Sequence, residues 1–232
     1  MEFSTTDDIA KALAWSVELF GDANPIALTL APMRFDSATR NDDSLAVTLS
    51  GEGSIGVTMG PHPPLDPRWT HCIIDGGLVG DQLGSLTARD EWDCYTLRTF
   101  ASEGPPAAHA VTDDELVTRF LDEHAPQSQV WPGNHEIVHW YAVRDEHAAV
   151  VSLAAVVRWE SGYHVVSSVA TVRELRGRGY ATALMRGIIH EVHGEGVEWL
   201  ALGVHHSNEP AQHVYRNVGF VLRAQFTTYA TD

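Results

Sequence analysis

The sequence predicts an α/β fold, and three features of the region after residue 93 support this prediction. Residues 148–157 are apolar apart from Ser152, as expected of a central strand that is buried on both faces. Residues 179–193 place apolar side chains on one helical face, namely Ala181, Leu184, Met185, Ile188 and Val192. Strand-like and helix-like segments alternate from there to the C-terminus, which is typical of layered α/β domains.

The first 92 residues have a weaker pattern. Ile9, Leu13, Val17 and Phe20 recur at helical spacing, which predicts a helix over 6–20 with Gly21 as its stop. Short β-like pieces are expected next, and the last two read as a hairpin with a Gly-Glu-Gly turn; they cover residues 25–33, 44–50 and 54–59. Four prolines make 61–67 a loop, and 71–92 supports no assignment.

From residue 93 onward the elements are better defined. The run Thr112-Asp113-Asp114-Glu115 is a capping signature that opens a helix to about His124. Apolar and β-branched runs predict the strands, and 3.6-residue periodicity predicts the helices. Strands are expected at 93–100, 137–143, 148–159, 163–172, 197–204 and 220–229, and helices at 179–193 and 208–217.

Composition disfavours several classes of partner. The chain has 31 acidic and 15 basic residues and a net charge of −16, so it repels nucleic-acid phosphates and attracts a cationic amine. No run of about 18 apolar residues predicts a membrane span. Cys72 and Cys94 form no pair motif, which argues against a disulfide framework or a cysteine zinc site. The acidic N-terminus predicts a cytoplasmic protein, and the sequence allows a homodimer.

A glycine-rich loop precedes the helix at 179–193. Residues 173–181 read Arg-Glu-Leu-Arg-Gly-Arg-Gly-Tyr-Ala, and three arginines lie within six residues of an otherwise acidic chain. Glycines let the backbone approach a ligand, and a helix start offers unpaired N–H groups with a partial positive charge. This combination predicts an anion site suited to a pyrophosphate. Neither a dinucleotide fingerprint nor a Walker loop has this spacing.

Two motifs in this region resemble the GNAT superfamily of acyl-CoA N-acyltransferases. Residues 176–181 resemble that family's Arg/Gln-x-x-Gly-x-Gly/Ala pyrophosphate motif. A second family pattern, Asn-x-x-Ala-x-x-x-Tyr-x-x-x-Gly-Phe, is matched by Asn208, Ala211, Tyr215, Gly219 and Phe220. The resemblance is clear over 163–229, weaker back to about 93, and not visible in 1–92. It implies a mixed, mostly antiparallel sheet flanked by helices, here with an additional N-terminal α/β segment.

The resemblance also implies a binding site for acetyl-CoA or another acyl-CoA as co-substrate, with no metal. In the family, the strand before the phosphate loop bends at a bulge and splays from the next strand, and the pantetheine arm enters the gap. The arm would contact Ala170, Thr171 and Val172, with residues 200–204 as the opposite wall. Main-chain N–H groups would hold the pyrophosphate, from Arg176, Gly177, Arg178, Gly179, Tyr180, Ala181 and Thr182.

Asn208 and Tyr215 are the expected chemical residues of the second motif. Seven residues of helix place them on one face, about 10 Å apart, with Ala211 between them to let the CoA arm pass. Tyr215 is protonated at neutral pH and would donate its proton to the departing thiolate. The oxyanion of the tetrahedral intermediate would be held by the main-chain N–H of Thr171 or Val172. The acceptor would be a small-molecule amine or a peptide N-terminus.

The general base is not specified by the sequence. Several family members use a Glu on the strand before the phosphate loop, but residues 163–172 contain no carboxylate. His164 is that strand's conventional candidate, and a water chain is another solution. Further candidates lie elsewhere, namely His139, Glu160, His205 and His206.

A competing motif reads His135-Glu136-Ile137-Val138-His139, the H-E-x-x-H pattern of zinc proteases, with Glu160 as a third ligand. That chemistry needs both imidazoles on one helix face. Pro132-Gly133 precedes the motif and a strand-like run follows, so the sequence favours a strand, on which the two histidines lie about 13 Å apart.

Three functional hypotheses follow. The first is acyl transfer, most simply of an acetyl group, from acyl-CoA to an amine, with Tyr215 as acid. The second is a non-catalytic acyl-CoA sensor or regulatory module, and the third is the zinc hydrolase. Residues 93–232 would form the acyltransferase domain, and 1–92 either an extension or a degenerate copy of the same fold. Three tryptophans would either pack in the core or line the acceptor site, namely Trp131, Trp140 and Trp159.

Overall fold

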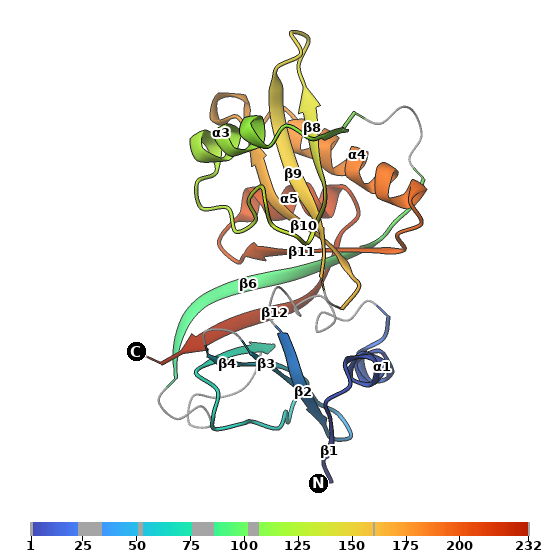
Figure 1. The fold of residues 1–232 in the computed structure, drawn as a ribbon, viewed down its shortest axis with the longest axis vertical. Coiled ribbons are helices and arrows are strands. Elements are labelled where there is room, and N and C mark those ends of the chain that lie inside the picture. Colours follow the sequence, from blue (N-terminus) through green and yellow to red (C-terminus); the bar gives the residue numbers. More distant parts are fainter. Residues whose placement is uncertain are drawn as a thin grey trace. The chain divides into compact units, whose positions relative to one another are not determined.

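The computed structural model of the chain describes residues 2–22, 34–50, 53–75, 86–101, 107–159 and 161–231. The chain forms two compact units (Figure 1). Unit 1 consists of Met1–Tyr95, Gly203–Glu209 and Leu222–Asp232, and unit 2 of Thr96–Leu202 and Pro210–Val221. Three strands contribute residues to both units, namely β6 (Thr87–Arg98), β11 (Trp199–His205) and β12 (Val221–Ala230).

Unit 1 is a sheet with one helix against its first strands. The strand order is β1-β2-β3-β4-β5-β12-β6, and the pairs from β1 to β12 are antiparallel except for the parallel pair β4–β5. The helix is α1 (Ile9–Phe20), which contacts β1, β2 and β3. The strands are β1 (Ser4–Thr6), β2 (Arg34–Arg40), β3 (Leu45–Ser50), β4 (Ser54–Met59), β5 (His71–Asp75) and β12 (Val221–Ala230).

The core of unit 1 forms around Trp69. A Cβ on Gly56 would lie 2.2 Å from the Trp69 ring, so only a glycine on β4 admits this indole. The indole Nε1 donates to the Thr48 hydroxyl at 3.1 Å, which satisfies the polar atom of an otherwise apolar ring. Trp69 packs with Cys72 and Ile74 of β5. The loop predicted at 61–67 therefore leads directly into the core.

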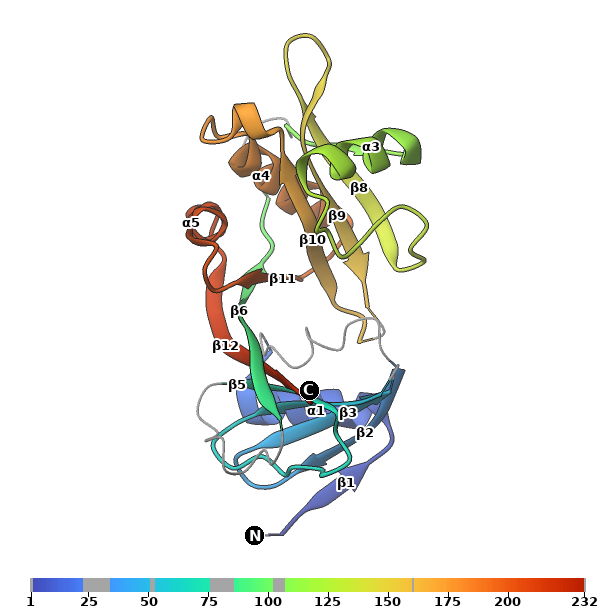
Figure 2. The same ribbon diagram turned by 90° about the vertical axis from the view of Figure 1, so that its left-hand side faces the viewer.

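Unit 2 is a second run of strands between two helices. Its order is β11-β10-β9-β8-β7, antiparallel except for the parallel pair β10–β11. The helices α3 (Asp114–His124) and α4 (Tyr180–Gly194) lie on opposite faces of these strands (Figure 2). The remaining elements are β7 (His109–Val111), β8 (Ile137–Arg144), β9 (Val150–Arg158), β10 (His164–Thr171) and α5 (Glu209–Asn217).

The core of unit 2 lies between α4 and the central strands. Strand β9 is buried from Val151 to Val157, as its apolar run predicts. The buried face of α4 presents Leu184, Met185 and Ile188 to β8, β9 and β10. At Gly187 a Cβ would lie 2.4 Å from that of Ala108, so the small residue lets the chain approach the helix closely.

The predicted fold class is confirmed: twelve strands form a mixed, mostly antiparallel sheet arrangement, and four α-helices are described. The predicted piece at 25–33 lies outside the described residues. Some helix boundaries differ from prediction: α1 begins at Ile9 and not at residue 6, which belongs to β1. Asp113, not Thr112, caps α3 by accepting the N–H of Leu116, and α4 continues through Gly194 before Gly196 takes the left-handed conformation. Strands β1, β2, β5 and β7 were not predicted.

Candidate functional site

Strand β10 carries a bulge in its middle. Its pairing with β9 shifts register between Ser167 and Ala170. Within this step Ser168 has a left-handed φ of 53°, which is unusual for a serine. Its hydroxyl donates to the carbonyl oxygen of Val130 at 2.8 Å and accepts the Val130 N–H at 3.3 Å, so a fixed segment of chain holds the bulge in place. The bulge implied by the resemblance is confirmed, and the residue that anchors it was missed.

Beyond the bulge, β10 presents one edge of its main chain away from β9. The Val172 N–H donates to the Val151 carbonyl at 3.0 Å, and the Ala170 carbonyl accepts from the Ser152 hydroxyl at 2.8 Å. N–H groups alternate in direction along a strand, so the Thr171 N–H points to the opposite edge. Of the two donors considered for an oxyanion, Val172 is therefore engaged within the sheet and Thr171 faces outward.

The parallel pairing of β10 with β11 is short. It joins His164 to Leu200 and Val165 to Ala201, and β10 then continues for six residues to Thr171. Leu200 and Leu202 are buried on the β11 side. The outward edge of β10 beyond Val165 is therefore the edge that the resemblance assigns to the pantetheine arm.

A loop joins the end of β10 to α4 and contains the predicted anion site. It begins with a 3₁₀ turn at Arg173–Leu175, and Gly177 and Gly179 then have φ values of 77° and 85°. Gly179 is the N-cap of α4, and no side chain bonds to the first N–H groups of that helix. The residues from Gly177 to Gly179 are exposed, and Tyr180, Ala181 and Thr182 are half-buried. Backbone donors of a 15-residue helix thus open onto the surface.

Arg176 has a different role from the one its charge suggested. Its guanidinium donates from Nε to the Thr171 carbonyl at 3.3 Å and from Nη2 to the His124 carbonyl at 3.0 Å. Its main-chain N–H points to the Arg173 carbonyl at 3.4 Å. Arg176 therefore ties the loop to the ends of β10 and α3, although it is exposed, as Arg173 and Arg178 are.

Tyr215 lies on the buried face of α5. The residue is 6% exposed, and its ring meets that of Phe220 edge-on at 6.1 Å. Burial raises the pKa of the phenol above its ordinary value, so Tyr215 keeps its proton at neutral pH. Ala211 lies one turn earlier on the same face. Asn208 is exposed just before α5, in the turn where its N–H donates to the His205 carbonyl at 2.9 Å.

The Gly-Phe end of the second motif has a structural cause. Gly219 has a φ of 103°, and the Phe220 N–H donates back to the Tyr215 carbonyl at 3.0 Å. This six-residue closure is a Schellman end, which favours glycine in the left-handed position. The motif therefore fixes the end of the helix that carries Tyr215.

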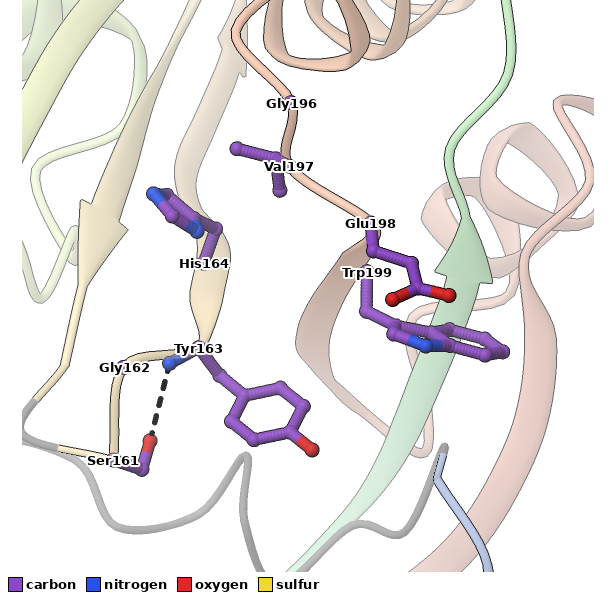
Figure 3. A pocket seen from close by; sticks show the side chains of 8 residues that line it. All are labelled: Ser161, Gly162, Tyr163, His164, Gly196, Val197, Glu198 and Trp199. Carbon is purple, nitrogen blue, oxygen red and sulfur yellow. Dashed lines mark hydrogen bonds between the residues drawn. The ribbon is translucent and has the colours of Figure 1, made fainter.

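His164 lines a pocket at the beginning of β10, at the far end of the strand from the phosphate loop (Figure 3). Seven residues of strand separate His164 from Thr171, about 23 Å. The cavity volume is about 350 Å³, and Figure 3 shows the Tyr163 ring and the Trp199 indole extending from the two strands while the imidazole points the other way. Burial, with the nearby charge of Arg158, lowers the pKa of His164.

The three other histidine candidates are each paired with an acid. His139 lies 3.5 Å from Glu195, a residue that also accepts the Tyr141 hydroxyl at 3.4 Å. His205 pairs with Asp90 at 3.1 Å, and His206 with Asp93 at 3.0 Å. Glu160 lies outside the described residues. Of the three tryptophans, Trp140 is buried in the core and Trp131 donates to the Ser128 carbonyl at 2.6 Å.

The H-E-x-x-H motif does not have the geometry of a zinc protease. His135 and Glu136 lie in a turn and His139 lies on β8, so the helix that would present both imidazoles on one face is absent from this described stretch. Within the described ranges no group of three His, Cys, Asp or Glu side chains could hold a metal ion. None of the described helices combines the length and apolar character needed to cross a membrane.

Comparisons with known proteins agree with this geometry. No curated protein matches the chain. Among solved structures, a GCN5-related N-acetyltransferase from Kribbella flavida is 16% identical with a TM-score of 0.61, over 90% of this chain and 95% of that one. A GCN5-related N-acetyltransferase from Sphaerobacter thermophilus is 14% identical with a TM-score of 0.59, over 98% and 94%. At these low sequence identities, the structural similarity establishes the fold alone.

A third solved structure, a GNAT-family protein from Novosphingobium aromaticivorans, is 22% identical with a TM-score of 0.52, over 70% of this chain and 74% of that one. The family comparison is more direct. The Acetyltransferase (GNAT) family matches residues 90–220, which is more than half of the chain and includes both motifs. With the bulged strand, the uncapped helix start and the Tyr215 helix in place, the chain belongs to the GNAT family of acetyltransferases.

Proposed function

We propose that this enzyme transfers an acetyl group from acetyl-CoA to an amine by direct attack of the amine on the thioester. The observation that carries the proposal is the start of α4, where Gly177 and Gly179 hold left-handed conformations and no side chain caps the helix. The N–H groups from Gly177 to Thr182 would bind the pyrophosphate, with Arg178 as an exposed positive charge. Arg176 would fix the loop rather than bind the ligand.

The outward edge of β10 would hold the rest of the co-substrate. Ala170, Thr171 and Val172 would lie along the pantetheine arm, with Asn208 contacting it from the turn before α5. The Thr171 N–H is directed away from β9, which supports it as the donor to the oxyanion. The bulge held by Ser168 would set the position of this edge.

The reaction balances with Tyr215 as acid. The neutral amine attacks the carbonyl carbon, and the C=O π pair moves onto oxygen. When the oxyanion re-forms the carbonyl, the C–S bond breaks and its electron pair goes to sulfur, which takes the Tyr215 proton. The extra proton on the amide nitrogen then restores the phenol. Tyr215 is protonated at neutral pH, so it has a proton to give to the departing thiolate.

The acceptor is proposed to be a small amine or a peptide N-terminus. The net charge of −16 supports a cationic acceptor, since the protein's field attracts it. The alternative is a sensor that binds acyl-CoA without turnover. The presence of Asn208 and Tyr215 in one motif favours the enzyme.

Two measurements test the proposal together. Calorimetry should detect acetyl-CoA binding, and thiol release should appear with at least one member of a panel of polyamines, arylalkylamines and short peptides. Binding without thiol release across the panel supports the sensor. Failure to bind acetyl-CoA contradicts both.

A further inference from the structure

Strand β9 is apolar from Val150 to Val157 except at Ser152, and this serine is 0% exposed. A buried hydroxyl costs free energy unless hydrogen bonds satisfy it, so a serine in such a run needs a partner. Its neighbour on β10 is Thr171, which is the Cα partner of Ser152 in the register of the two strands. The polar residue of the central strand therefore lies beside the part of β10 that follows the bulge.

Two hydrogen bonds satisfy the Ser152 hydroxyl, and their directions can be assigned. Its Oγ donates to the Ala170 carbonyl at 2.8 Å and lies 2.8 Å from the Oγ1 of Thr171. A hydroxyl has one hydrogen, and a carbonyl oxygen can only accept. Ser152 therefore gives its hydrogen to Ala170, and the Thr171 hydroxyl donates to Ser152. A chain of hydrogen bonds thus runs from the Thr171 side chain through Ser152 to the main chain of β10.

The Ala170 carbonyl and the Thr171 N–H belong to the same peptide group. A trans peptide is planar, so its C=O and N–H point in opposite directions and turn together. Ser152 holds the carbonyl on the β9 side, which directs the Thr171 N–H to the outward edge of β10. The carbonyl of Thr171 itself accepts Nε of Arg176 at 3.3 Å. The peptides before and after the Thr171 Cα are thus each held by a side chain.

We propose that Ser152 is the positioning residue of the oxyanion donor; this rests on the proposed function, in which the Thr171 N–H binds the oxyanion. A donor stabilises developing charge best when it is aimed before the reaction begins. Ser152 holds the carbonyl of the donor's peptide, and the Thr171 hydroxyl joins the donor's own side chain to the same serine oxygen. The N–H cannot turn out of line without breaking these hydrogen bonds.

Ser152 and Ser168 hold different parts of β10. Ser168 lies within the bulge and bonds to the main chain of Val130, in the segment between α3 and β8. Ser152 acts from the neighbouring strand on the residues after the bulge. Ser168 therefore holds the bend, and Ser152 sets the direction of the N–H that follows it. Because Ser152 is fully buried, it acts through Thr171 and transfers no proton to either substrate.

The first test is Ser152→Ala in the full chain, measured as thiol release with the best amine of the panel. Its kcat should fall by about 10²-fold, because a misplacement of about 1 Å at a reacting group costs that much. The KM for acetyl-CoA should stay unchanged, because the oxyanion forms only during the reaction. A merely destabilised protein would show the opposite pattern, with full turnover per molecule that binds acetyl-CoA by calorimetry.

Ser16→Ala is the matched control. Ser16 is also 0% exposed, and its hydroxyl donates to a main-chain carbonyl, that of Leu13, at 2.7 Å. The residue belongs to α1 in unit 1. Both variants lose a buried hydroxyl bonded to a carbonyl, so urea unfolding should show that both are destabilised. Only Ser152→Ala should lose turnover.

A second pair of variants tests the hydroxyl chain from its other end. Thr171→Val keeps the shape and the N–H but removes the hydroxyl, so its kcat should fall; Thr171→Ser keeps the hydroxyl and should retain most of the activity. The double variant Ser152→Ala and Thr171→Val should be no slower than Ser152→Ala alone, because the chain is already broken. Thr171 is half-buried, so this pair remains informative where Ser152→Ala does not fold.

The outcomes are distinct. Wild-type kcat in Ser152→Ala overturns the positioning role and leaves acyl transfer standing, and so does a raised KM for acetyl-CoA with unchanged kcat. Where Ser152→Ala does not fold, equal kcat values for Thr171→Val and Thr171→Ser overturn the role. Absence of thiol release by wild type with every amine overturns the proposed function and the positioning role with it.

Discussion

Arg176 donates from Nη2 to the carbonyl oxygen of His124, the last residue of α3, at 3.0 Å. Through Nε the same guanidinium reaches the Thr171 carbonyl at 3.3 Å. An arginine of the glycine-rich loop is thus engaged with the protein's own carbonyl groups. That contact holds the loop before α4 in position. The positive charges that could attract a ligand are then those of Arg173 and Arg178.

Replacing Arg176 with Met should destabilise the fold. The change removes hydrogen bonds from a charged donor to two carbonyls, and the unfolding free energy should fall by about 1–2 kcal/mol. Thermal denaturation measures the fall. Arg178→Met removes the same charge from an exposed position, so it should leave Tm unchanged and weaken acetyl-CoA binding in a salt-dependent way. Equal Tm values for the two variants would contradict the assignment.

Gly179→Ala should weaken acetyl-CoA binding at least tenfold. The residue has a φ of 85°, and an added Cβ would meet no protein atom within 4 Å, so the change strains the backbone by about 1–2 kcal/mol and fills space in front of the helix. Gly133, with a φ of 91° and equally open surroundings, is a matched control in a turn before β8. Calorimetry should show lost affinity for Gly179→Ala alone, and comparable losses in both would implicate strain instead of contact.

Tyr215→Phe should reduce the thiol-release rate by about 10²–10⁴-fold while acetyl-CoA still binds, because the leaving thiolate loses its proton donor. Tyr141→Phe is the control. Tyr141 is also buried, and its hydroxyl donates to Glu195 on the α4 side of the sheet. Steady-state kinetics with the best amine of the panel should show full activity in this control. Wild-type rates in Tyr215→Phe would remove the acid assignment.

The two cysteines should make the fold sensitive to alkali. Burial raises the pKa of the Cys72 thiol to about 12, and burial with the charges of Asp75 and Asp93 does the same for Cys94, against 9.0 for a free thiol. A folded-state pKa above the unfolded one gives stability that is present below pH 9 and lost as pH rises toward 12. Between these pH values the unfolding free energy should fall by about 1.4 kcal/mol for each thiol and each pH unit.

Urea unfolding at pH 8 and pH 10 measures this loss. The double variant Cys72→Ala and Cys94→Ala should be less stable at pH 8, because buried methyl groups replace larger thiols, but should depend less on pH. A slope identical to wild type would show that other groups cause the alkaline loss. Native Cys72 and Cys94 should also fail to react with thiol reagents, which keeps a thiol-release assay free of protein background.

The C-terminal elements could be predicted because their local signals agree with their packing. The continuous apolar run of β9 predicts a strand buried on both faces, and the single apolar face of α4 predicts a helix packed on one side. Glycines mark where α4 and α5 end. Strands β2 and β5 gave no such signal. Arg34–Arg40 has mixed polarity, and His71–Asp75 is five residues long beside a proline-rich loop. Their pairing partners, not their sequences, make them strands.

The sequence predicts which segments form the candidate site, but not the hydrogen bonds that join these segments to the rest of the protein. The glycine-rich loop before α4 and the helix that carries Tyr215 could be predicted because main-chain geometry needs glycines and helix starts at fixed spacings. The boundary at residue 92 stays a prediction. The contact of Arg176 with His124 and the anchor at Ser168 depend on segments that are remote in sequence. The hydrogen bond from Gln225 of β12 to Asp93 of β6 likewise joins segments that are remote in sequence.

Strand β12 supplies residues 226–230 as the partner of β5, so unit 1 needs the end of the chain to complete its sheet. During synthesis the N-terminal helix and hairpin leave the ribosome long before that strand exists. The nascent chain must carry an open edge at β5 through the synthesis of all of unit 2, and such an edge invites pairing with other chains. Removal of the last few residues should therefore unfold the beginning of the protein, and expression at low temperature with chaperones should help most while the chain is incomplete.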